Sequence, residues 1–310
     1  MVGDSGVTSQ GAVGALVEQC CSCLRGDRFA RCRMAGSRRG SVSRVRHHRD
    51  MDRQRISSIA HGEHSIAAPV SERRVGQLLG RLSLRPGASV VDLGCGAGAW
   101  LTRLAAVASD ARLLGVDTSA TALSEARATA DRLGLGGRIE WLEGDAASAD
   151  TGVHDAVLCV GASHAFGGLD GTLRAVRERL KVGGQVVVGD TIWEQPPSQA
   201  AQEALGAGPD DYPDLAGLVD AAVKAGFEVV DGHVSTLEEW DDYEWAWTGA
   251  LVRWALQQPR GSDDGEAALQ AAHGHRRAWL HGYRRHLGFA TLVLADVPSA
   301  RIGAVVGEPR

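Results

Sequence analysis

The chain has 310 residues, of which 44% are hydrophobic and 23% are charged, and its formal net charge is −5 at pH 7. A chain of this size and composition can bury a substantial globular core. No apolar run approaches the roughly 20 residues of a membrane-spanning helix, and the N-terminus lacks the apolar segment of a secretory signal, so we expect a soluble, cytoplasmic protein without a membrane partner.

Residues 1–50 carry nine arginines and no lysine, are rich in glycine and serine, and show no sustained periodicity. We predict that they form a disordered leader, followed by one domain over 51–310. Only two lysines occur in the whole chain, which is typical of a GC-rich gene, and we hypothesise that Met51 is the true start. Without the leader the formal net charge falls from −5 to −10, which disfavours a nucleic acid as partner.

The cysteines do not predict a disulfide framework or a metal site. Four of the six fall in the leader, without paired Cys-x-x-Cys spacing or accompanying histidines. The other two lie in predicted core elements. In chain order the six are Cys20, Cys21, Cys23, Cys32, Cys95 and Cys159.

From Ser71 onward, short apolar runs alternate with amphipathic stretches, which predicts a seven-stranded, doubly wound, mostly parallel α/β sheet. Pro69 and the segment Arg85-Pro86-Gly87 bracket the first predicted helix. The glycines of Val182-Gly183-Gly184 are expected to end the helix before strand five. The predicted helices are 70–84, 98–108, 119–133, 169–180 and 214–225, and the predicted strands are 88–93, 111–116, 138–142, 156–160, 185–190, 227–234 and 289–295.

A helical insertion is predicted between strands six and seven, over residues 235–288, and it holds five of the eight tryptophans. Spacings of three and four residues place five large side chains on one face of a helix. We interpret this stripe as facing the core, because large aromatics dominate core burial. The alternative is that part of it covers a substrate pocket. The five residues are Trp240, Tyr243, Trp247, Leu251 and Trp254.

A glycine-rich turn follows the first strand, with Gly94, Gly96 and Gly98. Such a turn lets the backbone approach a ligand, and the next helix directs free N–H groups at it. With Ala99 it also satisfies the dinucleotide fingerprint, and Asp117 after strand two suits a ribose in either case. The turn alone therefore leaves an NAD(P)-dependent oxidoreductase open.

Four motifs in order make the chain resemble class I S-adenosylmethionine-dependent methyltransferases over about residues 71–191. The first contains Asp92, an acid two positions before the first glycine, where dehydrogenases usually have an apolar residue. The motifs are Val91-Asp92-Leu93-Gly94-Cys95-Gly96-Ala97-Gly98, Leu114-Gly115-Val116-Asp117-Thr118-Ser119, Glu143-Gly144-Asp145-Ala146 and Leu180-Lys181-Val182-Gly183-Gly184.

The resemblance implies S-adenosylmethionine as cofactor and a role for each matching position. Asp92 and the glycine turn would hold the methionine part, and Asp117 would bind the ribose hydroxyls, since a carboxylate offers two acceptor oxygens to a diol. Asp145 and the Ala146 backbone would contact the adenine. Helix caps or surface positions are the alternative for these acids. The resemblance also places Thr118 and Val160 in the cofactor site.

His164, after strand four, is the candidate catalytic base, because a parallel sheet binds ligands beyond the carboxyl ends of its strands. The imidazole suits proton abstraction near neutral pH. Substrate binding or helix capping is the alternative. His61 and His64 are interpreted as lid or surface residues that could reach the substrate. Trp193 and Glu194 are weaker candidates, and His273, His275, His281 and His286 are interpreted as a solvated face.

Two absences narrow the expected acceptor. No Asn-Pro-Pro-aromatic segment follows strand four, as in enzymes that methylate base amino groups, and no cysteine lies in a substrate loop. We therefore predict methyl transfer to oxygen, nitrogen or sulfur of a small molecule. An NAD(P)-dependent oxidoreductase and a non-catalytic cofactor-binding module are the alternatives. The sequence does not indicate the oligomeric state.

Overall fold

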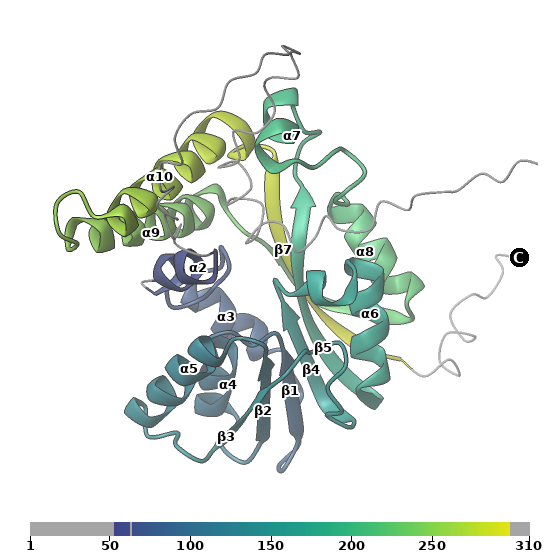
Figure 1. Ribbon diagram of the computed structural model, residues 1–310. Helices are drawn as coiled ribbons and strands as arrows, with labels where there is room; N and C mark the ends of the chain where they lie inside the picture. Colours follow the sequence, from purple (N-terminus) through teal and green to yellow (C-terminus); the bar gives the residue numbers. More distant parts are fainter. Residues whose placement is uncertain (1–52, 63, 298–310) are drawn as a thin grey trace, which may run out of the picture.

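A computed structural model describes residues 53–62 and 64–297 (Figure 1). The predicted leader, the hypothetical start at Met51 and the four N-terminal cysteines lie outside the described residues. No described helix is long and apolar enough to cross a bilayer.

Seven strands form one mixed sheet in the order β3-β2-β1-β4-β5-β7-β6. The pairs among β1 to β5 are parallel, whereas β7 runs antiparallel to both β5 and β6. This confirms the predicted α/β sheet. The strands are β1 (Ser89–Leu93), β2 (Arg112–Asp117), β3 (Ile139–Glu143), β4 (His154–Val160), β5 (Leu180–Trp193), β6 (Phe227–Val234) and β7 (Leu287–Asp296).

Helices cover both faces of the sheet, because successive strand residues point to opposite sides. On one side Val90 packs in a cluster with helices α3, α4 and α5. On the other side Val91 packs in a second cluster with α6 and α8. These helices are α3 (Glu72–Leu79), α4 (Ala99–Val107), α5 (Ala120–Arg132), α6 (Leu169–Glu178) and α8 (Leu215–Lys224).

The chain order reverses at β1, which lies between β2 and β4. The loops after β1 and β4 therefore leave the sheet toward opposite faces, and open α/β sheets bind ligands in the crevice that this reversal creates. The glycine turn and the segment of His164 follow these two strands, so the sheet brings the two candidate regions together.

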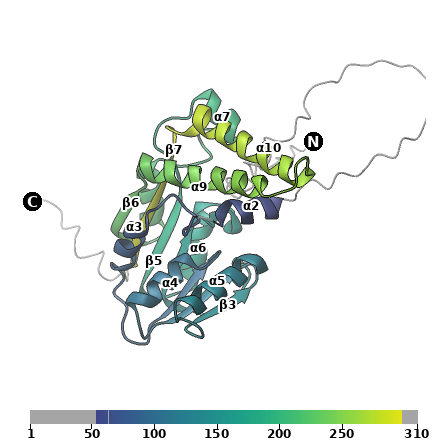
Figure 2. The same cartoon turned by 90° about the vertical axis from the view of Figure 1, so that its left-hand side faces the viewer.

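A group of helices packs at one end of the molecule, and we call α2, α9, α10 and η3 the cap. In both views α2 lies between α9 and the layer of α4 and α5 (Figures 1 and 2). Trp247 and Leu251 of α9 share a buried cluster with Ile56 of α2 and Ala268 of α10. The cap elements are α2 (Arg53–His61), α9 (Leu237–Leu256), α10 (Asp263–Ala278) and the π-helical turn η3 (Trp279–Tyr283), and α7 (Gln199–Leu205) packs against η3.

A capping box begins α9: the Thr236 hydroxyl accepts a hydrogen bond from the Glu239 N–H, and the Glu239 carboxylate accepts one from the Thr236 N–H. The same carboxylate accepts a hydrogen bond from the Ser71 N–H, and its Oε2 lies 2.8 Å from Nε2 of His233. Because Ser71 precedes α3, this one side chain ties the start of α9 to the start of α3 and to β6.

Two predicted boundaries are wrong. The segment Val182-Gly183-Gly184 was expected to end a helix, but it lies inside β5, where Gly183 adopts a φ of 74°. The strand starts early because His154 of β4 pairs with Leu180, with a bulge before the regular register resumes. The first predicted helix, 70–84, is shorter in the structure: α3 ends at Leu79, and Gly80 is its C-cap residue.

Candidate active site

The glycine turn between β1 and α4 requires glycine at its three predicted positions. Gly94, Gly96 and Gly98 have φ values of 81°, 52° and 74°, in the left-handed region that side chains disfavour. A Cβ at Gly94 would lie 2.4 Å from the Cβ of Ala162, and one at Gly98 would lie 2.2 Å from the Trp141 ring. Around Gly96 the space is open, so this part of the backbone can approach a ligand.

Asp117, at the end of β2, connects that strand to the glycine turn. Its Oδ2 accepts a hydrogen bond of 2.8 Å from the Gly96 N–H, and its Oδ1 accepts one of 2.8 Å from the Ser119 N–H. Thr118, between them, is exposed. Each carboxylate oxygen keeps a second lone pair, so Asp117 can hold the turn and still accept a hydrogen bond from a ligand.

Asp92 in β1 is buried, with 2% of its surface exposed, and its Oδ2 has no hydrogen-bond partner. Burial, together with the nearby Asp117, raises the pKa of this carboxyl to about 8. An unsatisfied buried carboxyl oxygen is costly. A ligand that brings a positive charge or a hydrogen-bond donor would remove that cost.

Asp145 and Ala146 follow β3. Asp145 is exposed, and its oxygens accept hydrogen bonds from the Ala147 N–H and the Ser148 hydroxyl. Ala146 is buried, and half-buried Val160 ends β4. The carboxylate of Asp145 thus stabilises its own turn, and its predicted contact with the adenine stays a prediction.

His164 is exposed on the short 3-10 helix η2 (Ser163–Phe166), directly after β4. The close approach of Ala162 to Gly94 places this helix beside the glycine turn. The Ser163 hydroxyl donates a hydrogen bond of 3.0 Å to Oδ1 of Asp190 in β5. Asp190 is buried, and burial raises the pKa of its carboxyl to about 6. Sequence reasoning missed this buried pair, which fixes the start of η2.

His61 and His64 lie against Tyr243 of α9, with ring centroids 6.0 and 5.4 Å from the tyrosine ring. Both are partly exposed. The His64 ring also forms a hydrogen bond with the backbone oxygen of Ile66. The structure therefore places the two histidines where α2 and the following segment meet α9.

The interpretation of His275 as part of a solvated face is wrong. His275 is buried, stacks on Trp247 with ring centroids 3.9 Å apart, and forms a short hydrogen bond with Glu244. Glu244 also accepts a hydrogen bond of 2.7 Å from the Tyr283 hydroxyl. Helical spacing could not reveal this partner, because it lies on another helix.

The remaining histidines of that set differ from one another. His273 and His281 are exposed, while His286 is partly buried and bonds through Nδ1 to the Pro196 oxygen at 3.0 Å. Within the described ranges, no group of three His, Cys, Asp or Glu side chains is arranged to hold a metal ion.

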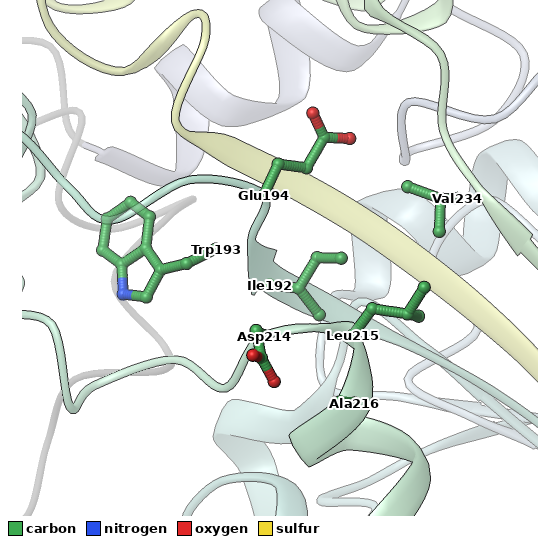
Figure 3. A pocket seen from close by; sticks show the side chains of 7 residues that line it. All are labelled: Ile192, Trp193, Glu194, Asp214, Leu215, Ala216 and Val234. Carbon is green, nitrogen blue, oxygen red and sulfur yellow. The ribbon is translucent and has the colours of Figure 1, made fainter.

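A cavity of about 390 Å³ lies at the end of β5, and none of its lining residues belongs to the glycine turn. Trp193 is buried beside it and donates a hydrogen bond from its indole to the Gly208 oxygen, so its polar group is already satisfied. The carboxylates of Glu194 and Asp214 point in opposite directions (Figure 3). The lining is Ile192, Trp193, Glu194, Asp214, Leu215, Ala216 and Val234.

The residues around the glycine turn fit S-adenosylmethionine. This cofactor carries a cationic sulfonium and an ammonium group, and its ribose presents a diol. The buried Asp92 oxygen lacks a partner, Asp117 has acceptor capacity left, and the Gly96 backbone faces open space. The site therefore offers a carboxyl that can ionise beside a cation, a diol acceptor and room for close approach.

Comparisons with known proteins agree. Residues 90–184 match the model of a family described as "Methyltransferase domain". The chain is 32% identical to the uncharacterized protein YjhP of Escherichia coli (strain K12) over 226 residues, which cover 71% of this chain and 89% of that protein.

Two solved structures are similar over most of their length. A SAM-dependent methyltransferase from Geobacter sulfurreducens, in complex with S-adenosyl-L-homocysteine, has a TM-score of 0.72 and 27% identity, covering 78% of this chain and 98% of that one. A SAM-dependent methyltransferase from Thiobacillus denitrificans, also in complex with S-adenosyl-L-homocysteine, has a TM-score of 0.70 and 28% identity, with the same coverage.

Proposed function

The chain belongs to the class I S-adenosylmethionine-dependent methyltransferases, and from this premise we propose that it methylates an oxygen, nitrogen or sulfur atom of a small molecule. The family decides between the two cofactors that the glycine turn alone allowed. S-adenosylmethionine, and not NAD(P), is the cofactor. The acceptor and the roles of individual residues belong to the proposal.

The proposed cofactor contacts follow from the geometry of each side chain. Asp117 accepts hydrogen bonds from the ribose hydroxyls through its remaining lone pairs while it holds the Gly96 N–H. Asp92, whose buried oxygen lacks a partner, binds the methionine part together with the glycine turn. Around the adenosine we place Asp145, Ala146, Thr118 and Val160.

The packing of Gly94 against Ala162 is the observation that carries the proposed chemistry. It puts η2, and with it exposed His164, next to the turn that holds the methyl donor. When bound, S-adenosylmethionine supplies an electrophilic methyl group on a cationic sulfur. The protein would align the acceptor, and His164 would take the proton that the acceptor atom loses as the methyl group moves to it, while the methyl–sulfur bond breaks and leaves S-adenosylhomocysteine.

Two features support a small-molecule acceptor: the negative net charge of the chain and the helical cap. Formal net charge is −5 for the whole chain, which disfavours a nucleic-acid backbone. The tryptophan-rich helix α9 and the adjoining helix α10 pack at the same end of the molecule as α2 (Figure 1). We propose that this cap covers the acceptor and keeps water from it.

His164→Ala tests the proposed base. We expect methyl transfer from labelled S-adenosylmethionine into the small-molecule fraction of a cell extract to fall by about 10²–10⁴-fold. Binding of S-adenosylhomocysteine should stay within about twofold of wild type, because His164 does not support the cofactor. His273→Ala, an exposed histidine on α10, is the control and should keep full activity.

Two results would contradict this proposal. Undiminished transfer by His164→Ala would show that another group takes the proton. Label that appears in protein or RNA, and not in the small-molecule fraction, would refute the proposed acceptor class.

A further inference from the structure

Four aromatic rings meet where α2 and the segment after it pack on α9, and we call them the cap rings: His61, His64, Trp240 and Tyr243. Tyr243 is at their centre, with its ring centroid 6.0, 5.4 and 6.3 Å from those of His61, His64 and Trp240. They come from α2, the segment after it and α9, so the cluster exists only when α2 is docked on α9.

Two polar atoms of the cap rings are enclosed without a hydrogen-bond partner. Trp240 is 5% exposed, and its Nε1–H, which can only donate, finds no acceptor. The enclosed Nδ1 of His61 has no partner either. Leaving such groups unsatisfied is costly, and a ligand with an acceptor oxygen would satisfy the Trp240 N–H.

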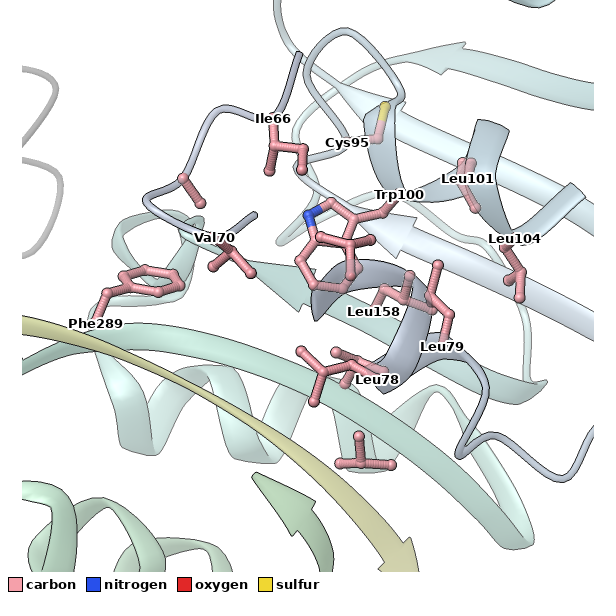
Figure 4. Packing of buried hydrophobic residues seen from close by; sticks show 14 of the residues in the cluster. Ile66, Val70, Leu78, Leu79, Cys95, Trp100, Leu101, Leu104, Leu158 and Phe289 are labelled. Atoms are coloured by element: carbon pink, nitrogen blue, oxygen red, sulfur yellow. The ribbon is translucent and has the colours of Figure 1, made fainter. Parts of the chain in front are cut away.

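The cap rings adjoin the glycine turn through a short stretch of packed side chains. His64 bonds to the backbone oxygen of Ile66. Ile66 shares one buried cluster with Cys95, inside the glycine turn, and with Trp100 (Figure 4). Trp240 belongs to the same cluster. The cap rings and the glycine turn therefore belong to one continuous packed cluster, and on this ground we place the acceptor next to the methyl donor.

The side chains of the cap rings favour an uncharged ligand. Burial, His64 and His275 lower the pKa of His61 to about 4, so its imidazole is neutral near pH 7. No acid or permanently charged base belongs to the set. Ring faces in tilted and edge-on contact suit a flat ligand, and the Trp240 N–H requires an acceptor atom on it.

We propose that the cap rings bind the methyl acceptor and that this acceptor is a planar, uncharged molecule with a hydroxyl or carbonyl oxygen. The proposal rests on the proposed function, because it names the class of molecule that the same site methylates. A hydroxyarene has the required shape and chemistry.

The test uses 2-naphthol as probe and naphthalene as its match without oxygen, each titrated by ligand-observed NMR into the full chain saturated with S-adenosylhomocysteine. We expect 2-naphthol to bind more tightly than naphthalene. Trp240→Phe, which keeps a ring but removes the N–H, should weaken 2-naphthol binding by about three- to tenfold. His61→Phe should do the same.

Trp254→Phe is the matched control. Trp254 lies on the same face of α9, but it is not one of the cap rings, and Cζ of Arg55 lies 5.3 Å from its ring centroid. It should leave 2-naphthol binding unchanged. Affinity for S-adenosylhomocysteine should be unchanged in all three variants, which shows that they are folded. If the wild type does not bind S-adenosylhomocysteine, the proposed function fails. If it binds that ligand but not 2-naphthol, or if neither Trp240→Phe nor His61→Phe weakens the probe, the acceptor assignment is overturned.

Discussion

At the scale of single residues, Asp117 does two things at once: it fixes the glycine turn and offers acceptor oxygens to the ribose. Asp117→Ala removes both, so we expect binding of S-adenosylhomocysteine to weaken by about 1–3 kcal/mol. Calorimetric titration measures this. Asp110→Ala, an exposed acid just before the opposite end of β2, is the control, and equal affinity of Asp117→Ala and wild type would refute the ribose contact.

Asp92 makes the stability of the cofactor-free protein depend on pH. Burial raises its pKa to about 8, above the value of about 3.9 in an unfolded chain. Between these values the folded state binds a proton that the unfolded state has released. The free energy of unfolding should therefore fall as pH rises from about 4 to about 8.

Asp92→Asn removes this titration, because the amide stays neutral. Urea denaturation without cofactor should find the variant more stable than wild type at pH 8 by on the order of 2 kcal/mol, with a smaller difference at pH 5. Exposed Asp110→Asn should follow the wild type. A wild-type pH dependence in Asp92→Asn would show that this carboxyl is not the buried titrating group.

Residues inside a sequence motif could be predicted, whereas residues defined by a distant partner could not. The three turn glycines have the left-handed φ values that the motif implies. The pairing of Ser163 with Asp190 joins positions 27 residues apart, and that of Glu244 with His275 joins positions 31 apart. Hydrophobic periodicity along the sequence does not predict contacts between side chains on different elements.

At the scale of elements, one buried carboxylate holds the cap together, because Glu244 of α9 bonds to His275 of α10 and to Tyr283 of η3. Glu244→Ala removes the buried acceptor that His275 and Tyr283 share and should lower the free energy of unfolding by about 3–5 kcal/mol. Urea denaturation measures the loss. Glu238→Ala, exposed on the same helix, should cost little, and similar midpoints for the two variants would contradict the role of Glu244.

The bounds of a helix or strand can be predicted from the sequence where a local feature, such as a glycine that ends the preceding element, determines them. Strand β6 begins and ends as predicted, at Phe227 and Val234, since Gly226 precedes it with a φ of 85°. Strand β5 was predicted to begin at residue 185, because Gly183 and Gly184 were interpreted as the end of a helix. Pairing with β4 extends the strand back to Leu180. Tertiary pairing overrode the local preference.

At the scale of the whole molecule, the sheet order brings the loops after β1 and β4 together, and the cap gathers aromatic rings from separate segments. The alternation of strands and helices predicted the first of these features. The second depends on the docking of α2 onto α9, which join residues near opposite ends of the domain. Hydrophobic periodicity and motif spacing describe local structure, so they do not predict the contact between α2 and α9.

A crystal structure of the full chain with S-adenosylhomocysteine tests the central claim most directly. We predict the ligand along the glycine turn, its ribose hydroxyls at hydrogen-bond distance from Asp117, and its sulfur facing His164 and the cap rings. A ligand bound elsewhere, for example in the cavity lined by Ile192 and Leu215, or one that leaves Asp117 untouched, would contradict the account.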